Sequence, residues 1–178
     1  FMIPDSSKSK KLSIYKCLSF PNSWELHASI FHGESVSDPI IFKDDNGIFW
    51  LFCNKSEDVY DDHNSELYIY QIDNILTFQN IKSHFLNPVI INSEYSRNGG
   101  NIFINNQKII RTSQSSINSF YGKKINFHEI TKLNLFEYEE RLIKSINPDF
   151  HKNIHSTHHI SFDNNKYVID ACFNFEIK

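Results

Sequence analysis

The stretch Ser37–Cys53, SDPIIFKDDNGIFWLFC, decides how this chain is expected to fold. Two apolar runs flank the segment Asp44–Gly47, whose Asp, Asn and Gly residues favour a tight turn between antiparallel strands. The stretch therefore predicts a β-hairpin. Its first strand opens on Asp38 and Pro39, and proline is tolerated at the start of a strand. Asp38 has two interpretations: it holds backbone N–H groups where the strand begins, or it belongs to a functional site.

The same hairpin pattern recurs twice later in the chain. Residues 100–114 (GNIFINNQKIIRTSQ) and 159–172 (HISFDNNKYVIDAC) align with residues 39–53, and an Asp or Asn opens each turn. Alternating segments, which suit strands with one buried face, lie between the hairpins. They occur in pairs, at residues 12–17 and 24–31, 67–72 and 78–85, and 125–130 and 138–146. Four short strands thus repeat about every 60 residues, which is typical of the blades of a β-propeller.

We therefore predict an all-β protein in which one β-propeller domain, or a fragment of one, covers residues 1–178. The repeat divides the chain into a partial blade, two complete blades and a second partial blade, at residues 1–36, 37–93, 94–150 and 151–178. These units amount to about three blades, whereas propellers contain about four to eight. We expect the chain to be part of a longer domain. The alternatives are a small closed ring in which the two partial blades pair and, for residues 136–146, a short helix.

The composition argues against several classes of function. The formal charge of −3 and the lack of a dense Lys/Arg block predict no nucleic-acid partner. No apolar run approaches the roughly 18 residues of a membrane span. The cysteines Cys17, Cys53 and Cys172 lack metal-ligand spacing and lie in apolar strand patterns, so we expect buried free thiols in a reducing, cytoplasmic compartment. We expect no cofactor and no metal.

Candidate site residues lie where the first strand of each unit begins, because those ends of propeller strands point into the central funnel. Asp38 holds this position in the first complete unit. In the second unit Arg97 and Asn98 hold it, followed by two glycines that let the backbone approach another group closely. Arg97 offers a planar fork of donors for a carboxylate or phosphate, and its alternative is an exposed residue of a surface turn.

Two polar residues on the next strand, Arg111 and Gln114, are also candidates. An arginine inside an apolar strand is unusual unless it is paired or faces the funnel. Tyr121 precedes another strand and would place a phenol near the centre, or pack within a turn. Asp5 follows the end of an apparent earlier strand and could face the same funnel.

A cluster of histidines precedes the third hairpin. His158 and His159 would point to opposite faces of a strand, so they are poorly placed to share one metal ion. We expect His158 to reach the funnel and hydrogen-bond a ligand.

Several motifs, in this order, resemble those of the N-terminal domain of the glucosamine inositolphosphorylceramide transferase family. They are MIPDS, LSIYKCLSFPNSW, SDPIIF with NGIFWLFC, ELYIYQIDNI, LNPVI, SRNGG, IIRTSQ with YGKKINFHEITKL, and HHISF. The resemblance implies a five-bladed propeller related to glycoside hydrolase families 43 and 32, with an earlier blade before residue 1. It also implies bacterial relatives linked to surface-polysaccharide synthesis. The family's RPAG reads Arg97–Gly100 here and its RPAQD reads Arg111–Ser115, so both prolines and the second acid are replaced.

The resemblance does not imply that these residues act as a glycoside hydrolase. Most glycosidases need two carboxylates at the scissile bond. The hydrolase relatives take their base or nucleophile from the first blade, and Asp38 matches only a third carboxylate that orients the site. The position of their general acid is occupied here by residues Arg97–Gly100. An arginine does not donate its proton at ordinary pH, so Arg97 cannot replace that acid. The only acidic residue nearby in the sequence is Glu94. Arg97 and Arg111 would suit an anionic group instead.

Three functions follow from the residues together with the resemblance. The first is a carbohydrate-recognising propeller that acts in synthesis or modification of a surface glycan and binds an acidic or phosphorylated sugar at its axis. Its partners would be a carbohydrate, sugar nucleotide or glycolipid, and a fused or associated transferase domain. The second is a glycoside hydrolase or glycosyltransferase whose acids come partly from a missing blade, with Asp38 as helper. The third is a protein-interaction propeller.

Overall fold

A computed structural model describes residues 1–56, 62–117, 120–163 and 166–173 of the chain. Within these ranges the protein is all-β, with a short 3-10 turn (η1, Ser7–Ser9) and no α-helix. The strands are β1 (Leu12–Ser19), β2 (Ser23–Ile30), β3 (Ser35–Lys43), β4 (Phe49–Ser56), β5 (Glu66–Asn74), β6 (Gln79–Ser83), β7 (Ile90–Ile91), β8 (Phe103–Asn105), β9 (Lys108–Gln114), β10 (Ile125–Leu133), β11 (Tyr138–Ile146), β12 (Ile154–Ser156), β13 (Ile160–Asp163), β14 (Lys166–Ile169) and β15 (Cys172–Phe173). The all-β class predicted from the sequence is confirmed.

The repeating unit is an antiparallel meander of four strands. One sheet has the order β3-β4-β5-β6, with β7 paired to β5, and a second has the order β11-β10-β9-β8. The hairpin β1–β2 corresponds to the last two strands of this unit, and the hairpin β13–β14 corresponds to its first two. A small pair, β12 and β15, completes the described strands. Residues 138–146 form a strand, as the repeat predicts, and not a helix.

Turn chemistry explains why the hairpins fold locally. In the β3–β4 turn the Asp44 carboxylate accepts hydrogen bonds from the backbone N–H groups of Asn46 and Ile48, each at 2.9 Å. Its other oxygen accepts one from the Trp50 indole, also at 2.9 Å. In the β8–β9 turn Asn106 and Gln107 both have positive φ, as the tightest two-residue hairpins require. These polar turns fix the register of the strands on either side.

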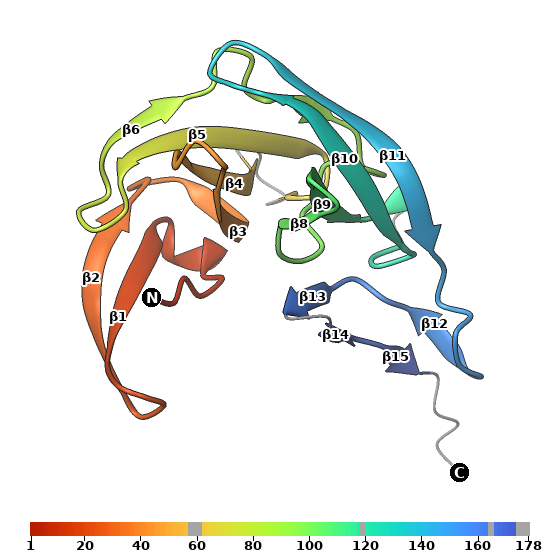
Figure 1. Cartoon of the computed structure of the whole chain (residues 1–178). Coiled ribbons are helices and arrows are strands. Elements are labelled where there is room, and N and C mark those ends of the chain that lie inside the picture. Colours follow the sequence, from red (N-terminus) through yellow and green to blue (C-terminus); the bar gives the residue numbers. More distant parts are fainter. Residues whose placement is uncertain (57–61, 118–119, 164–165, 174–178) are drawn as a thin grey trace.

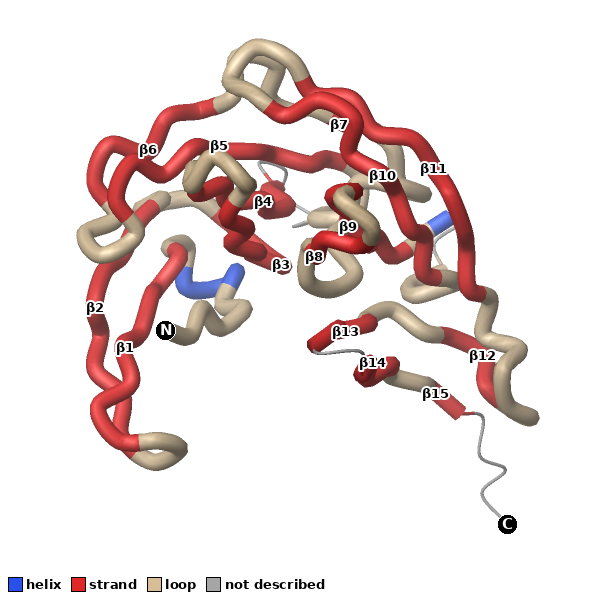
Figure 2. The backbone as a smooth tube through the Cα atoms, in the orientation of Figure 1, coloured by secondary structure: helices blue, strands red, loops and turns tan. Residues whose placement is uncertain are grey.

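The sheets follow one another around an arc (Figures 1 and 2). Strands β3, β8 and β13 lie closest to the centre of the arc, and β2, β6 and β11 lie on its outside. No sheet of the described residues closes on itself as a barrel. The number of blades and the boundaries assigned from the repeat stay predictions, although β3 begins at Ser35, two residues before the expected boundary.

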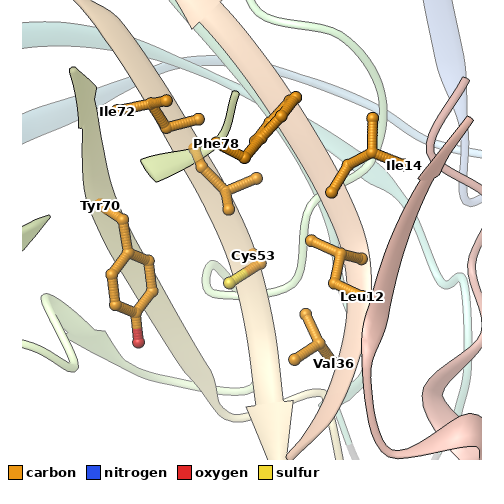
Figure 3. Packing of buried hydrophobic residues seen from close by; sticks show 8 residues of the cluster. Leu12, Ile14, Val36, Cys53, Tyr70, Ile72 and Phe78 are labelled. Carbon is orange, nitrogen blue, oxygen red and sulfur yellow. The ribbon is translucent and has the colours of Figure 1, made fainter. Parts of the chain in front are cut away.

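Apolar layers join each sheet to the next. The first layer contains Leu12 and Ile14 of β1 against Val36, Leu51 and Cys53 of the following sheet (Figure 3). The second layer joins the sheet β3–β6 to the sheet β8–β11, and the third joins that sheet to the hairpin β13–β14. Each apolar layer lies between two sheets that follow one another along the chain. Each sheet therefore buries apolar side chains against the next one.

Two expectations from the sequence are wrong. Cys172 is exposed, because β15 is a two-residue edge strand; only Cys53 is fully buried, and all three thiols are free. His158 and His159 do not lie on a strand, because β13 begins at Ile160. Their backbone N–H groups both donate to Asp170 Oδ1, at 2.9 and 2.8 Å. No helix in the described part of the chain is long and apolar enough to span a bilayer.

Candidate functional site

Asp38 lies at an irregular point of the β3–β4 pairing. The register shifts between Ser37 and Ile40, so Asp38 and Pro39 bulge out of the ladder. Asp38 adopts a φ of +47°, a region that is uncommon for residues other than glycine. Since such conformations persist where the surroundings impose them and gather at functional sites, the backbone itself marks Asp38 as a candidate.

Arg97 pairs with Asp38 although 59 residues separate them in the chain. Its Nε donates to Asp38 Oδ2 at 2.7 Å, and its Nη1 donates to Asn64 Oδ1 at 2.9 Å. Its guanidinium carbon lies 5.0 Å from the centre of the Tyr121 ring, a cation–π contact. Three segments of the chain thus hold Arg97 in place. Only 14% of its side chain is exposed, so Arg97 is not the exposed turn residue of the alternative interpretation.

The segment from Arg97 to Gly100 is fixed by hydrogen bonds to its neighbours. The Asn98 N–H donates to Asn54 Oδ1 at 2.9 Å, and Asn98 Nδ2 donates to the Asp38 carbonyl at 2.9 Å. A Cβ on Gly99 would lie 2.8 Å from the Gln114 nitrogen, and one on Gly100 would lie 1.7 Å from the Ile160 carbonyl oxygen. The close backbone approach expected for these two glycines is therefore confirmed.

Tyr121 and His158 complete the group. Their ring centres are 5.1 Å apart, and His158 Nδ1 contacts Asp170 Oδ2. Both rings remain partly exposed, the His158 side chain by 41%. We call Asp38, Arg97, Asn98, Gln114, Tyr121 and His158 the central cluster. It draws on β3, β9 and the loops before β8, β10 and β13, so the sequence prediction that these residues meet is consistent with the geometry.

Asp5 lies at the edge of the central cluster. Its carboxylate makes only long contacts, accepting from the Ser37 hydroxyl at 3.3 Å and from the Asp38 N–H at 3.4 Å. The negative charge of Asp5 helps raise the pKa of Asp38. Asp5 is therefore near enough to act on the same ligand as Asp38.

Arg111 lies behind the cluster and does not face it. Its side chain has no exposed surface and forms a two-pronged ion pair with Glu140, with Nε–Oε2 at 2.8 Å and Nη2–Oε1 at 2.7 Å. Nη2 also donates to the Tyr95 carbonyl at 2.6 Å, and Nη1 reaches Asn98 Oδ1 at 3.2 Å. An arginine in this strand was expected either to be paired or to face the funnel, and Arg111 is paired. Through its hydrogen bond to Asn98 it supports the central cluster from inside the fold.

Gln114 presents an unsatisfied polar atom to the cluster. Its Nε2 donates to the Asn98 carbonyl at 3.0 Å, whereas its buried Oε1 accepts no hydrogen bond within the described residues. The buried hydroxyls of Thr112 and Ser115 are likewise without partners there. Three such atoms within four residues are uncommon, because buried polar groups are normally hydrogen-bonded. The concentration at the end of β9 indicates a place for water or for the polar groups of a ligand.

The electrostatics of the site are set by burial. Burial raises the pKa of Asp38, and the charge and hydrogen bond of Arg97 offset only part of that rise. Burial also raises the pKa of Tyr121, and Arg97 offsets part of that rise. Perturbed groups of this kind gather at functional sites.

Sequence reasoning missed three residues that hold the cluster: Asn64, Asp170 and Glu140. Asp170 lies in the repeated hairpin stretch VIDAC, where an acidic residue near the strand end was a usable signal. Glu140 lies in the charged run YEERLIK, which is indistinguishable from a solvated strand face. Among the described residues no set of three or more His, Cys, Asp or Glu side chains is arranged to hold a metal ion.

Comparison with known proteins gives a family. The family model described as "Glucosamine inositolphosphorylceramide transferase 1, N-terminal" matches residues 1–163. Glucosamine inositolphosphorylceramide transferase 1 of Arabidopsis thaliana is 31% identical over 143 residues, which cover 79% of this chain and 18% of the plant protein. The protein of the same name from Oryza sativa subsp. japonica is 28% identical over 142 residues, with the same coverage. The match thus spans less than a fifth of these relatives, and it confirms the family that the motifs indicated. This chain belongs to the family of N-terminal domains of glucosamine inositolphosphorylceramide transferase 1.

Proposed function

We propose that this chain is a carbohydrate-recognition domain that acts in the synthesis of a glycan or glycolipid, with the central cluster as its binding site. One observation carries the proposal. Polar side chains from segments far apart in the chain meet around Asp38, whose φ is positive, and Gln114, whose Oε1 has no partner among the described residues. Asn98 and Gln114 are buried, and the other members of the cluster are at least partly exposed. Sugars are recognised by converging hydrogen-bond donors and acceptors of this kind, placed beside aromatic rings such as that of Tyr121.

The family supports the glycan part of the proposal. The relatives are named glucosamine inositolphosphorylceramide transferase 1, a name that contains a sugar and a lipid. The chain matches only 18% of those proteins. In this proposal its role is to recognise the substrate or product of a transferase domain, fused or associated. The substrate classes in this proposal are a free sugar, a sugar nucleotide and a glycolipid.

The architecture we propose is a five-bladed β-propeller of the kind found in glycoside hydrolase families 43 and 32. Its support is the four-stranded repeat and the arc of the sheets, with β3, β8 and β13 innermost (Figure 1). In that architecture the central cluster lies near the axis, where loops of several blades converge.

The hydrolase alternative has weaker support. A glycosidase needs one carboxylic acid and one carboxylate on opposite sides of the scissile bond. Asp38 is committed to Arg97 at 2.7 Å, and the neighbouring acid, Asp5, contacts the backbone of Asp38 itself. Two acids so close to each other leave little room for a sugar between them.

A binding experiment tests the proposal. The protein would be screened against an array of neutral, amino and acidic glycans, and hits would be measured by isothermal titration calorimetry. Arg97→Ala removes the contacts to Asp38, Asn64 and Tyr121, so we expect binding to fall by at least about tenfold. Arg141→Ala, at an arginine whose side chain is 64% exposed and pairs with Glu129 at the surface, is the matched control. Absence of any glycan ligand, or equal affinities for the two variants, would refute the proposed function.

A further inference from the structure

The outermost strand of the sheet β8–β11 has an unpaired edge. Strand β11 lies at the end of the order β11-β10-β9-β8, on the outside of the arc, and no other described strand pairs with its outer side (Figure 1). It has nine residues, whereas β6, at the outside of the preceding sheet, has five. A long free edge offers a row of backbone N–H and C=O groups to another strand.

Apolar side chains are exposed at the middle of this edge. Leu142 is 46% exposed and Ile143 is 50% exposed, although both lie in a strand. Leu142 also lines a cavity of about 810 Å³ together with Ile90 and Ile91, which form β7 of the preceding sheet. Ile91 is 70% exposed. A free strand edge beside exposed apolar side chains is a surface on which a further strand can bind.

The charges along β11 are divided by sign. Glu137 and Glu139, where the strand begins, are both 58% exposed, and one cation, Lys132, contacts both of them. Further along, Arg141 is 64% exposed, and its partner Glu129 is shared with a second cation. The beginning of the strand is therefore net negative, and the part that follows is net positive.

We propose that β11 pairs antiparallel with β11 of a second copy of this chain, with the twofold axis at Glu140. Antiparallel pairing places the acidic beginning of each strand against the basic part of the other. Glu139 then lies opposite the second copy's Arg141, and Tyr138 lies opposite the second copy's Leu142. Each contact occurs twice, because the interface is symmetric. This inference goes beyond the proposed function and does not depend on it.

The faces of the strand agree with this register. Glu139 and Arg141 are two residues apart, so they lie on one face of the sheet, where each contacts a residue of β10. Glu140 and Leu142 lie on the opposite face. Glu140 is buried and already paired with Arg111 inside its own fold. Two copies of Glu140 at the axis therefore do not bring two free charges together.

The mass of the protein in solution tests the proposal by sedimentation equilibrium at low salt, because salt screens surface ion pairs. At about 50 μM the wild type should have twice the mass of one 21.0 kDa chain. Glu139→Arg and Arg141→Glu should each weaken the dimer at least about tenfold, since like charges then face each other. An equimolar mixture of the two variants should form dimers again, because each introduced charge meets an opposite one.

Lys82→Glu is the matched control, at a lysine of β6 that is 51% exposed and pairs with Asp73. It should leave the dimer unchanged, and circular dichroism would show that every variant is folded. A monomeric wild type at about 50 μM overturns the proposal. So does a dimer that neither charge reversal weakens, or one that mixing the two variants does not restore. Arg141 is not part of the central cluster, so none of these outcomes bears on glycan binding there.

Discussion

At the scale of single residues, Asp38 combines properties that a strand-opening aspartate does not need. Its backbone has a positive φ, its carboxyl pKa is raised by burial, and its partner Arg97 comes from another sheet's loop. Asp44 is the contrasting case, because its carboxylate accepts three hydrogen bonds within its own hairpin. Asp44 therefore stabilises its own hairpin, whereas the surroundings of Asp38 hold it at a positive φ and with a raised carboxyl pKa.

Asparagine substitutions separate these roles. A carboxyl whose pKa is raised on folding disfavours the folded state at pH values above that pKa, and this penalty vanishes at low pH. Asp38→Asn removes the charge and tolerates positive φ, so at pH 7 we expect an unfolding free energy equal to or above that of the wild type. Asp44→Asn loses acceptors and should cost about 1–2 kcal/mol. Urea unfolding measures both, and a loss above about 1 kcal/mol for Asp38→Asn would make Asp38 structural.

His128 predicts how stability depends on pH. Burial, together with the charge of Arg111, lowers its pKa to about 4 from an ordinary value of 6.5. Between pH 4 and pH 6.5, His128 is protonated in the unfolded chain but not in the folded protein. The free energy of unfolding should therefore fall as the pH drops from 6.5 to 4. The slope attributable to this group is at most about 1.4 kcal/mol per pH unit.

Replacing the histidine tests this account. His128→Gln should flatten the stability profile in that range, whereas His32→Gln, at an exposed histidine, should leave it unchanged. Equal profiles for the wild type and His128→Gln would show that other groups control the acid sensitivity.

At the scale of elements, strands β9 and β11 are linked by the buried pair of Arg111 and Glu140. Burial alone would raise the pKa of Glu140, but Arg111 and His128 hold it below its ordinary value. Removing one partner leaves an unpaired buried charge. Glu140→Gln should therefore lower the unfolding free energy by about 3–5 kcal/mol. Glu129→Gln removes the partner of the exposed side chains of Lys108 and Arg141 and should cost much less than Glu140→Gln. Comparable losses for the two variants in urea unfolding would contradict the buried role of Glu140.

Gly100 links the sheet β8–β11 to the hairpin β13–β14. It forms a parallel bridge with Ile160 and has a φ of +143°. Gly100→Ala would force a Cβ against the Ile160 carbonyl, so we expect a loss of at least about 3 kcal/mol in thermal or urea unfolding. Gly33→Ala is the matched control, since Gly33 also has positive φ but nothing within 4 Å, and it should cost about 1 kcal/mol. Similar losses for both variants would mean that the close approach is unimportant.

The elements were predictable from sequence where the information is local. Apolar alternation and Asp/Asn turns gave the hairpins, and their repetition gave the strand order within each sheet, because each meander pairs consecutive strands. Local information also explains the errors. Nothing near Cys172 shows that its strand has two residues, and nothing near His158 shows that β13 begins after it.

At the scale of the whole molecule, the sheets follow one another around an arc (Figure 2), and contacts between residues of different sheets form the central cluster. The repeat allowed Asp38, Arg97 and Tyr121 to be grouped from sequence, since each occupies a comparable loop or strand start. It did not reveal that Arg97 would be neutralised by Asp38, or Arg111 by Glu140. Ion pairing depends on distances between segments 59 and 29 residues apart, which no pattern of residue types encodes.

The most direct measurement is a crystal structure of the protein with the sugar that binds it most tightly. The account predicts a sugar within hydrogen-bond distance of Asp38, Gln114 or Tyr121, with the Asp38–Arg97 pair retained. A sugar found instead in the cavity of about 810 Å³ between Tyr95 and Leu142, or on any surface away from the central cluster, would contradict it.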